Sequence, residues 1–335
     1  MANKKEDTNI SRYCARALAP YISALNKSAK NILKRNNIED IHDVRVATRR
    51  IRAVLTSFAD YLPEKKVKAW RRDIKKITQS YGKVRDLDVQ LDLLNDIYEK
   101  TTDTKLRSGL RRLKLRLSQK RKKRQDNTTE RTDQLLQSAS IIEMNTWIQA
   151  TLSQFPKDEI PKSPELFQLG YKQIQSCLDD LLFYEVFIFD KRRIDELHKM
   201  RISAKSLRYS LEVFSDLYEK KTDFALTIAK KAQEYLGDIH DNDIWIDFLP
   251  KFLQEELGRI KDFYGYSSPY RRIKPGIEFL IENRKTEREK QYKAFLKDWK
   301  KWKLDETWLN LRKVIFLTSI ESDNPEEISS VSDST

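Results

Sequence analysis

Two segments of the chain carry the same pattern of histidine, arginine and lysine. Residues 42–58 read HDVRVATRRIRAVLTSF, and residues 198–214 read HKMRISAKSLRYSLEVF. Aligned without gaps, the segments pair His42 with His198, Arg45 with Arg201, Arg49 with Lys205, and Arg52 with Arg208. Guanidinium and ammonium groups form strong charge-assisted hydrogen bonds with phosphate oxygens, and a neutral imidazole still donates one N–H. The pattern is therefore of a kind that binds an anionic ligand.

Helical spacing would place these basic residues on one side of each segment. At about 100° per residue, Arg45, Arg49 and Arg52 lie at roughly 300°, 340° and 280° from His42. The apolar residues between Val44 and Phe58 lie at roughly 140° to 220° on the same helix. Neighbouring like charges repel, so this cationic stripe indicates either an anionic ligand or neutralisation by aspartates of the same chain. Both interpretations stay open.

A second pair of segments follows each stripe at nearly the same distance. Residues 75–92 read KKITQSYGKVRDLDVQLD, and residues 230–247 read KKAQEYLGDIHDNDIWID. The matched basic residues are Lys75, Lys76 and Arg85 in the first half and Lys230, Lys231 and His240 in the second. Gly82 and Gly237 also match, and each is expected to end a helix as a cap glycine. The matched aspartates Asp86, Asp88, Asp241 and Asp243 are expected to have structural roles, capping the next helix or orienting arginines.

The composition favours helices as the elements that position these residues. Apolar residues make up 39% of the 335 residues and charged residues 35%, which suits helices with narrow apolar stripes. The chain has only seven Gly and nine Pro, too few for a sheet-rich fold with many turns. We predict an all-α fold of two tandem helical halves. Its expected parts are a disordered N-terminus (1–9), a first helical repeat (10–150), a Pro-containing connector (151–164), a second repeat (165–318) and an acidic disordered tail (319–335), with a loop at 264–276 inside the second repeat.

The net charge of +14 favours an anionic partner such as nucleic acid, a lipid surface or a phosphate polymer. Cys14 and Cys177 have no CxxC spacing and are expected to be free thiols in a reducing compartment. No apolar run reaches the roughly 18 residues of a membrane span, and the start of the chain has no apolar signal core. We therefore expect a cytoplasmic protein without a membrane partner.

Taken in order, the four segments resemble the CHAD domain, the conserved histidine α-helical domain. The resemblance covers about residues 10–315 and implies two helical bundles related by a pseudo-two-fold axis, with a central basic groove that binds inorganic polyphosphate, often at polyphosphate granules. It implies no cofactor. By similarity, the groove residues are His42, Arg45, Arg49, Arg52, Lys75, Lys76, Arg85, His198, Arg201, Lys205, Arg208, Lys230, Lys231 and His240. Two more basic stretches, at 111–124 and 282–290, suggest Arg121 and Arg284 as a further, loosely aligned pair.

Three other functions remain open at this point. A nucleic-acid-binding protein would suit the charge, but the stripes carry no Asn or Gln to contact base edges. A metal-dependent phosphohydrolase would use His42, Asp43, His240 and Asp241, yet the repeat replaces Asp43 with Lys199 and His240 with Arg85, and neither replacement binds metal. The third is a scaffold for an acidic protein. The sequence favours a non-catalytic polyphosphate-binding protein with no metal site.

Overall fold

The computed structural model describes residues 8–35, 38–125, 128–156 and 159–323, and this part of the chain consists of helices and short connections. The all-α prediction is confirmed. The first half contains α1 (Thr8–Arg35), α2 (Ile38–Ser57), η1 (Ala59–Tyr61), α3 (Glu64–Lys100), α4 (Thr104–Gln125), α5 (Thr128–Leu136) and α6 (Ala139–Leu152). The second half contains α7 (Pro164–Phe183), η2 (Tyr184–Phe187), α8 (Ile194–Phe214), α9 (Asp223–Tyr264), α10 (Tyr270–Leu304) and α11 (Thr307–Asp323).

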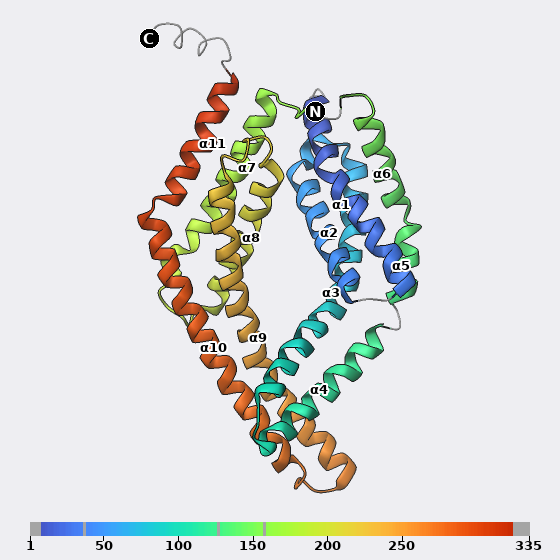
Figure 1. Cartoon of the computed structure of the whole chain (residues 1–335), viewed down its shortest axis with the longest axis vertical. Coiled ribbons are helices and arrows are strands. Elements are labelled where there is room, and N and C mark those ends of the chain that lie inside the picture. Colours follow the sequence, from blue (N-terminus) through green and yellow to red (C-terminus); the bar gives the residue numbers. More distant parts are fainter. Residues whose placement is uncertain (1–7, 36–37, 126–127, 157–158, 324–335) are drawn as a thin grey trace.

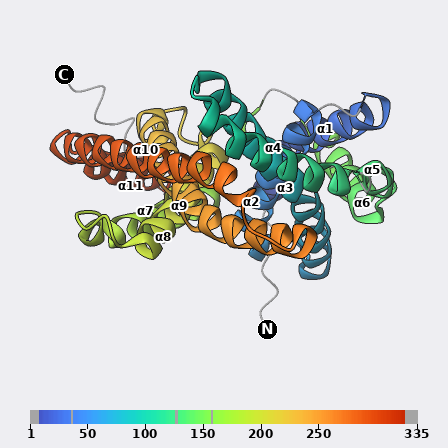
Figure 2. The same cartoon turned by 90° about the horizontal axis from the view of Figure 1, so that it is seen from below.

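The helices form two bundles that lie side by side, with two long hairpins extending from them. Figure 1 shows α1, α2, α5 and α6 in one bundle and α7, α8 and α11 in the other, while the α3–α4 and α9–α10 hairpins continue downward and meet. Figure 2 views the molecule from this lower end, where α4 packs on α10. The hairpins share a core of their own, made of Leu87, Leu94, Leu110, Leu113, Leu117, Trp245, Leu249, Phe252, Leu253, Ile277 and Leu280.

The bundles also meet through matched aromatic residues at the ends of α2 and α8. The rings of Phe58 and Phe214 have centroids 5.7 Å apart, and Tyr13 from α1 packs against both at 6.1 and 6.2 Å. All three side chains are buried, and the Tyr13 hydroxyl donates to the Val213 carbonyl at 2.9 Å. This contact holds α2 beside α8, which brings the two predicted cationic stripes together.

Two glycines, one in α4 and one in α10, allow the hairpins to cross closely. A Cβ atom on Gly109 of α4 would collide with the Ile273 carbonyl, and one on Gly276 of α10 would collide with the Leu106 carbonyl. Each glycine lies against the backbone of the other helix. The close approach of α4 and α10 therefore requires a residue without a side chain at both positions.

Several boundaries differ from those predicted. Gly82 and Gly237 do not end helices, because α3 and α9 continue through them. The predicted loop at 264–276 is shorter: α9 ends at Tyr264 with Gly265 in the left-handed conformation, and α10 starts at Tyr270. Helix α1 begins at Thr8, inside the predicted disordered start, and α11 continues to Asp323, inside the predicted tail. Residues 1–7 and 324–335 lie outside the described residues.

The predicted connector lies between α6 and α7. Helix α6 ends at Leu152, and α7 starts at Pro164, where the Ser163 hydroxyl accepts a hydrogen bond from the Leu166 N–H at 3.2 Å.

Both cysteines are free thiols, Cys14 buried and Cys177 half-buried, and burial raises the pKa of each. Among the described helices, we find none with the length and apolar character that a bilayer span requires.

Candidate functional site

A cavity between α2 and α8 is lined by cationic residues of both halves. Its volume is about 360 Å³, and its walls include Arg49 and Arg52 from α2 and Lys205 from α8. Helix α7 adds one carboxylate, Asp180, and α8 adds the ring of Tyr209. The two stripes that the sequence placed on separate helices thus face one space.

Lys205 lies at the centre of this cationic group. Burial lowers the pKa of its ammonium to about 8, and Arg49, Arg201, Arg52 and Arg45 lower it further in that order. Asp180 lies in the wall of the same cavity as Lys205, and the largest charge effects on Lys205 come from the four arginines. Within the described part of the chain, Arg49, Arg52, Arg201 and Lys205 form no ion pair. The four cations therefore lie close together without an ion pair to a described carboxylate, although Asp180 shares their cavity.

Several nitrogen atoms of this group are buried and have no hydrogen-bond partner among the described residues. They are Nε of Arg49, Nε of Arg201 and Nδ1 of His198. Leaving a buried donor without a partner costs about 1–3 kcal/mol, and more for a charged group. Such a cost in both halves of the site is consistent with donors arranged for a ligand.

Two of the three histidines form a tilted ring pair beside Arg201. The rings of His198 on α8 and His240 on α9 have centroids 4.0 Å apart and planes inclined by 32°. Burial lowers the pKa of His240 to about 4, with His198 and Arg201 adding to the effect. At neutral pH His240 is uncharged and can donate one N–H without adding to the positive charge.

The matched glycines Gly82 and Gly237 each lie opposite an arginine. A Cβ atom on Gly82 would collide with Nη1 of Arg45, and one on Gly237 would lie 3.6 Å from Nε of Arg201. Matched arginines thus approach matched glycines in both halves. Arg45 also pairs with Asp86 at 3.5 Å, while burial and the neighbouring Arg49 and Arg85 lower its pKa.

A larger cavity adjoins Arg45 on the first half. Its volume is about 840 Å³, and it is lined by residues of α2, α3 and α4, among them Arg45, Lys76, Lys83, Lys123 and Arg124. Asp86 is the carboxylate in its wall. Together with the cavity between α2 and α8, it gives a cationic surface that follows one side of α2.

Besides Arg45, four more of the predicted groove residues are paired with carboxylates. Glu212 accepts from Arg208 at 2.9 Å and lies 4.0 Å from Lys230. Lys231 pairs with Asp298 of α10 at 2.6 Å, and Lys76 lies 3.8 Å from Asp73. Of the remaining predicted groove residues, His42 and Arg85 are half-buried, and Lys75 is exposed.

The family comparison finds that the CHAD domain family matches residues 16–250 of the chain. The chain belongs to the CHAD domain family. Two solved structures share the fold of this CHAD domain. The crystal structure of the CHAD domain from the plant Ricinus communis has a TM-score of 0.55 at 20% identity, covering 80% of this chain and 91% of that one. PptA from Streptomyces chartreusis has a TM-score of 0.59 at 14% identity, covering 87% and 99%. No curated protein matches the sequence.

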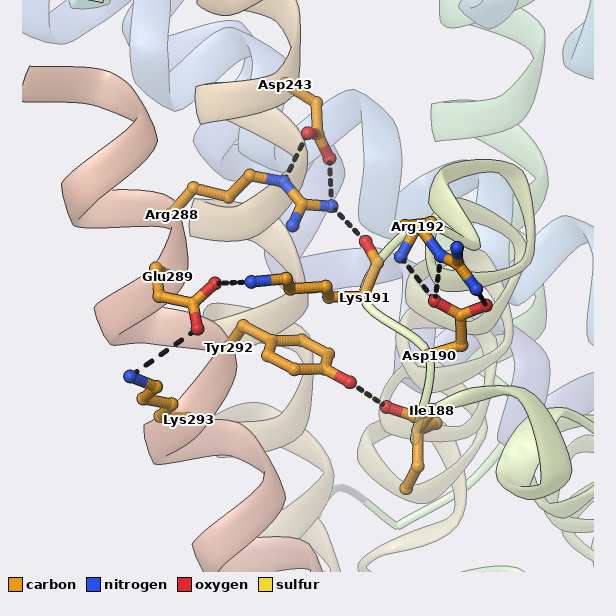
Figure 3. Close-up of polar contacts among 9 residues, drawn as sticks. All are labelled: Ile188, Asp190, Lys191, Arg192, Asp243, Arg288, Glu289, Tyr292 and Lys293. Carbon is orange, nitrogen blue, oxygen red and sulfur yellow. Dashed lines mark hydrogen bonds and ion pairs between the residues drawn. The ribbon is translucent and has the colours of Figure 1, made fainter. Parts of the chain in front are cut away.

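The loosely aligned pair Arg121 and Arg284 needs correction in this CHAD domain. Arg121 of α4 pairs with buried Asp88 of α3, and the matching aspartate of α9, Asp243, pairs with Arg288. Figure 3 shows Arg288 reaching both oxygens of Asp243 and the Lys191 carbonyl. Arg288, one helical turn after Arg284, is therefore the counterpart of Arg121. Arg121 thus joins α4 to α3, and Arg288 joins α10 to α9, within the two hairpins.

Sequence reasoning missed Lys83, Lys123 and Arg124 as site residues of the CHAD domain. Lys83 follows Gly82 directly, but Asp238 stands at its matched position, so the repeat gave no signal for it. Lys123 and Arg124 belong to a basic stretch that also has the composition of a solvated helix face. In the described ranges, no three His, Cys, Asp or Glu side chains come together as a metal site would require.

Proposed function

We propose that this CHAD domain binds inorganic polyphosphate, without catalysis, in the cationic cavities along α2 and α8. The observation that carries the proposal is the position of Lys205 among Arg49, Arg52 and Arg201, which brings cations of both halves together. Each of these side chains can form charge-assisted hydrogen bonds worth about 1.5–3 kcal/mol with a phosphate oxygen, before the costs of association. A bound anion would also relieve the repulsion among the cations.

A phosphate polymer suits this site better than a nucleic acid does. Arg49, Arg52 and Lys205 line a cavity of about 360 Å³, which a slender, flexible chain can enter more readily than the surface of a duplex can. Proteins that bind single strands usually stack bases on exposed rings. The aromatic residue lining the cavity is Tyr209, whose ring centroid already has Lys205 and Arg208 at 5.9 and 5.8 Å.

Calorimetric titration with long-chain polyphosphate tests the proposal. We expect saturable binding that weakens steeply as salt rises, because binding releases counterions from the polymer. Labelled polyphosphate should withstand competition by duplex DNA added at the same charge concentration and salt. Absence of binding, or displacement by DNA at equal charge, would contradict the proposal, as would sustained phosphate release in the presence of a divalent metal ion.

Alanine substitutions at three helical glycines test the role of Arg45. We expect Gly82→Ala to displace the Arg45 guanidinium and weaken polyphosphate binding about tenfold, the equivalent of one lost charge-assisted hydrogen bond. Because the displaced atom is the end of a flexible side chain, the fold should be retained. Binding is measured by calorimetry and stability by urea denaturation.

Gly237→Ala and Gly258→Ala are the controls for this substitution. A Cβ atom at Gly237 has an ordinary contact at 3.6 Å, and one at exposed Gly258 on α9 has no neighbour within 4 Å. Both should bind like the wild type and gain about 0.5–1 kcal/mol of stability from the helix preference of alanine. Equal binding by all three variants would show that Gly82 does not position Arg45 for the ligand.

A further inference from the structure

The two halves of the protein differ in charge at matched positions. The Gly109–Gly276 contact and the Arg121–Asp88 and Arg288–Asp243 pairs set the register of α4 against α10. When α4 is aligned with α10 on these contacts, and α3 with α9 on the repeated segments, four residues of the first half that are neutral or basic align with acidic residues of the second half. The aligned residues are Gln79 and Glu234, Lys83 and Asp238, Lys120 and Glu287, and Lys122 and Glu289. The fold repeats, and the charge does not.

The first half presents an open cationic face. Lys83, Lys123 and Arg124 line the cavity of about 840 Å³ beside Arg45, and none of the three forms an ion pair within the described residues. Lys83 and Lys123 are exposed, and Arg124 is half-exposed. The carboxylate in this wall, Asp86, is paired with Arg45. An anion on this face would meet several cations and one neutralised carboxylate.

The matching face of the second half is acidic, and its lysines are already paired. Burial raises the pKa of Asp238, and Asp241, Glu234 and Glu287 raise it further, which shows that these carboxylates lie close together. Lys290 pairs with Glu287 at 3.3 Å. Figure 3 shows Glu289 between Lys191 and Lys293, at 2.8 and 3.5 Å. A polyanion on this face would meet Glu234 and Asp238, which form no ion pair among the described residues, and lysines that are already paired.

Helix α2 connects the central group to the cationic face. Arg52 and Arg49 line the cavity shared with Lys205, while Arg45 lines the larger cavity of the first half. Arg52 and Arg45 are separated by about 10 Å along the helix, given a rise of about 1.5 Å per residue. A flexible phosphate chain held at Lys205 can therefore continue past Arg45 onto α3 and α4.

We infer that a long polyphosphate chain leaves the central site in one direction only, onto the α3–α4 face, where Lys83, Lys123 and Arg124 bind its further phosphates. The carboxylates of the α9–α10 face exclude the chain from the pseudo-symmetric route. This inference rests on the proposed function, and it identifies long chains as the ligands that use the whole site. Short chains, such as tripolyphosphate, occupy only the central cavity.

The test compares two charge-reversed double variants with two ligands. Lys83→Glu combined with Lys123→Glu should weaken binding of long-chain polyphosphate by about tenfold or more, or about 1.4 kcal/mol, and should change tripolyphosphate binding less than about twofold. The control is Lys290→Glu combined with Lys293→Glu on α10, which changes the net charge by the same amount on the matching face of the second half. It should bind both ligands like the wild type, within about twofold.

A reciprocal variant tests exclusion by the second half. Asp238→Lys combined with Glu287→Lys should strengthen long-chain binding and steepen its salt dependence, because new cations would contact the polymer. The one-directional route would be overturned if the Lys83/Lys123 and Lys290/Lys293 variants lost the same affinity for long chains. It would also be overturned if the Lys83/Lys123 variant lost the same affinity for tripolyphosphate as for long chains. Either result would leave the proposed function standing. A wild-type protein that binds neither ligand would overturn the proposed function itself.

Discussion

Polyphosphate binding is expected to fall at least about 100-fold in a variant that combines His198→Ala with Arg201→Glu, a loss of about 2.7 kcal/mol or more. Arg201 is one of the cations around Lys205, and its Nε is buried without a partner. A carboxylate at position 201 would neutralise Lys205 and repel the incoming phosphates. Removing the His198 imidazole takes away a second donor, whose Nδ1 is also buried and unpartnered. Calorimetric titration with long-chain polyphosphate measures the loss.

This variant is expected to keep its helical circular dichroism, because neither residue belongs to the apolar core of α8. Lys313→Glu is the control. It changes the net charge by the same amount at an exposed position on α11, on the outside of the second bundle (Figure 1). The control should bind like the wild type. If the α8 variant also binds like the wild type, the assignment of the α8 stripe to the site is wrong.

The sequence predicted the helices and the general place of the site because both depend on periodicity. The apolar side of residues 42–58 had to be buried, and the cationic stripe beside it then lay near the edge of that buried surface. A repeated segment with the same pattern suggested that two stripes would face each other. The structure places Arg49 and Lys205, from the two segments, in the wall of one cavity.

The roles of the matched glycines could not be predicted, because a glycine that caps a helix and one that admits a neighbouring side chain give the same sequence pattern. Gly82 and Gly237 follow apolar helical segments and precede aspartates, which is typical of helix ends. Only the packing of α2 on α3 and of α8 on α9 shows that each glycine lies opposite an arginine.

Ion pairs between residues far apart in the sequence could not be predicted either. Lys231 matches Lys76 in sequence, but its partner Asp298 lies on another helix, and no spacing rule connects them. The alignment of Arg121 with Arg284 was displaced by one helical turn, because both arginines stand in stretches rich in charged residues. The glycine contact between α4 and α10 sets the correct register, and that contact depends on how the two hairpins cross.

Asp243→Ala is expected to lower the free energy of unfolding by about 3 kcal/mol, since it leaves a buried arginine without its carboxylate. The side chains of Asp243 and Arg288 are 12% and 11% exposed, so water replaces the lost partner poorly. Arg288 would keep its hydrogen bond to the Lys191 carbonyl at 3.0 Å, which limits the loss (Figure 3). Urea denaturation followed by circular dichroism measures the change.

Asp247→Ala is the matched control, one turn further along α9. Asp247 pairs with Lys251, but the two side chains are 69% and 64% exposed, and such surface pairs contribute about 0.5 kcal/mol or less. A loss no larger than that of the control would mean that the Asp243–Arg288 pair does not hold α9 to α10. Replacing the pair by apolar residues, with Asp243→Leu and Arg288→Met together, should recover much of the stability, because the largest cost comes from a single unpaired buried charge. Recovery of stability in this double variant, together with unchanged polyphosphate affinity, would assign the pair to the hairpin scaffold and separate it from the cations that bind the ligand.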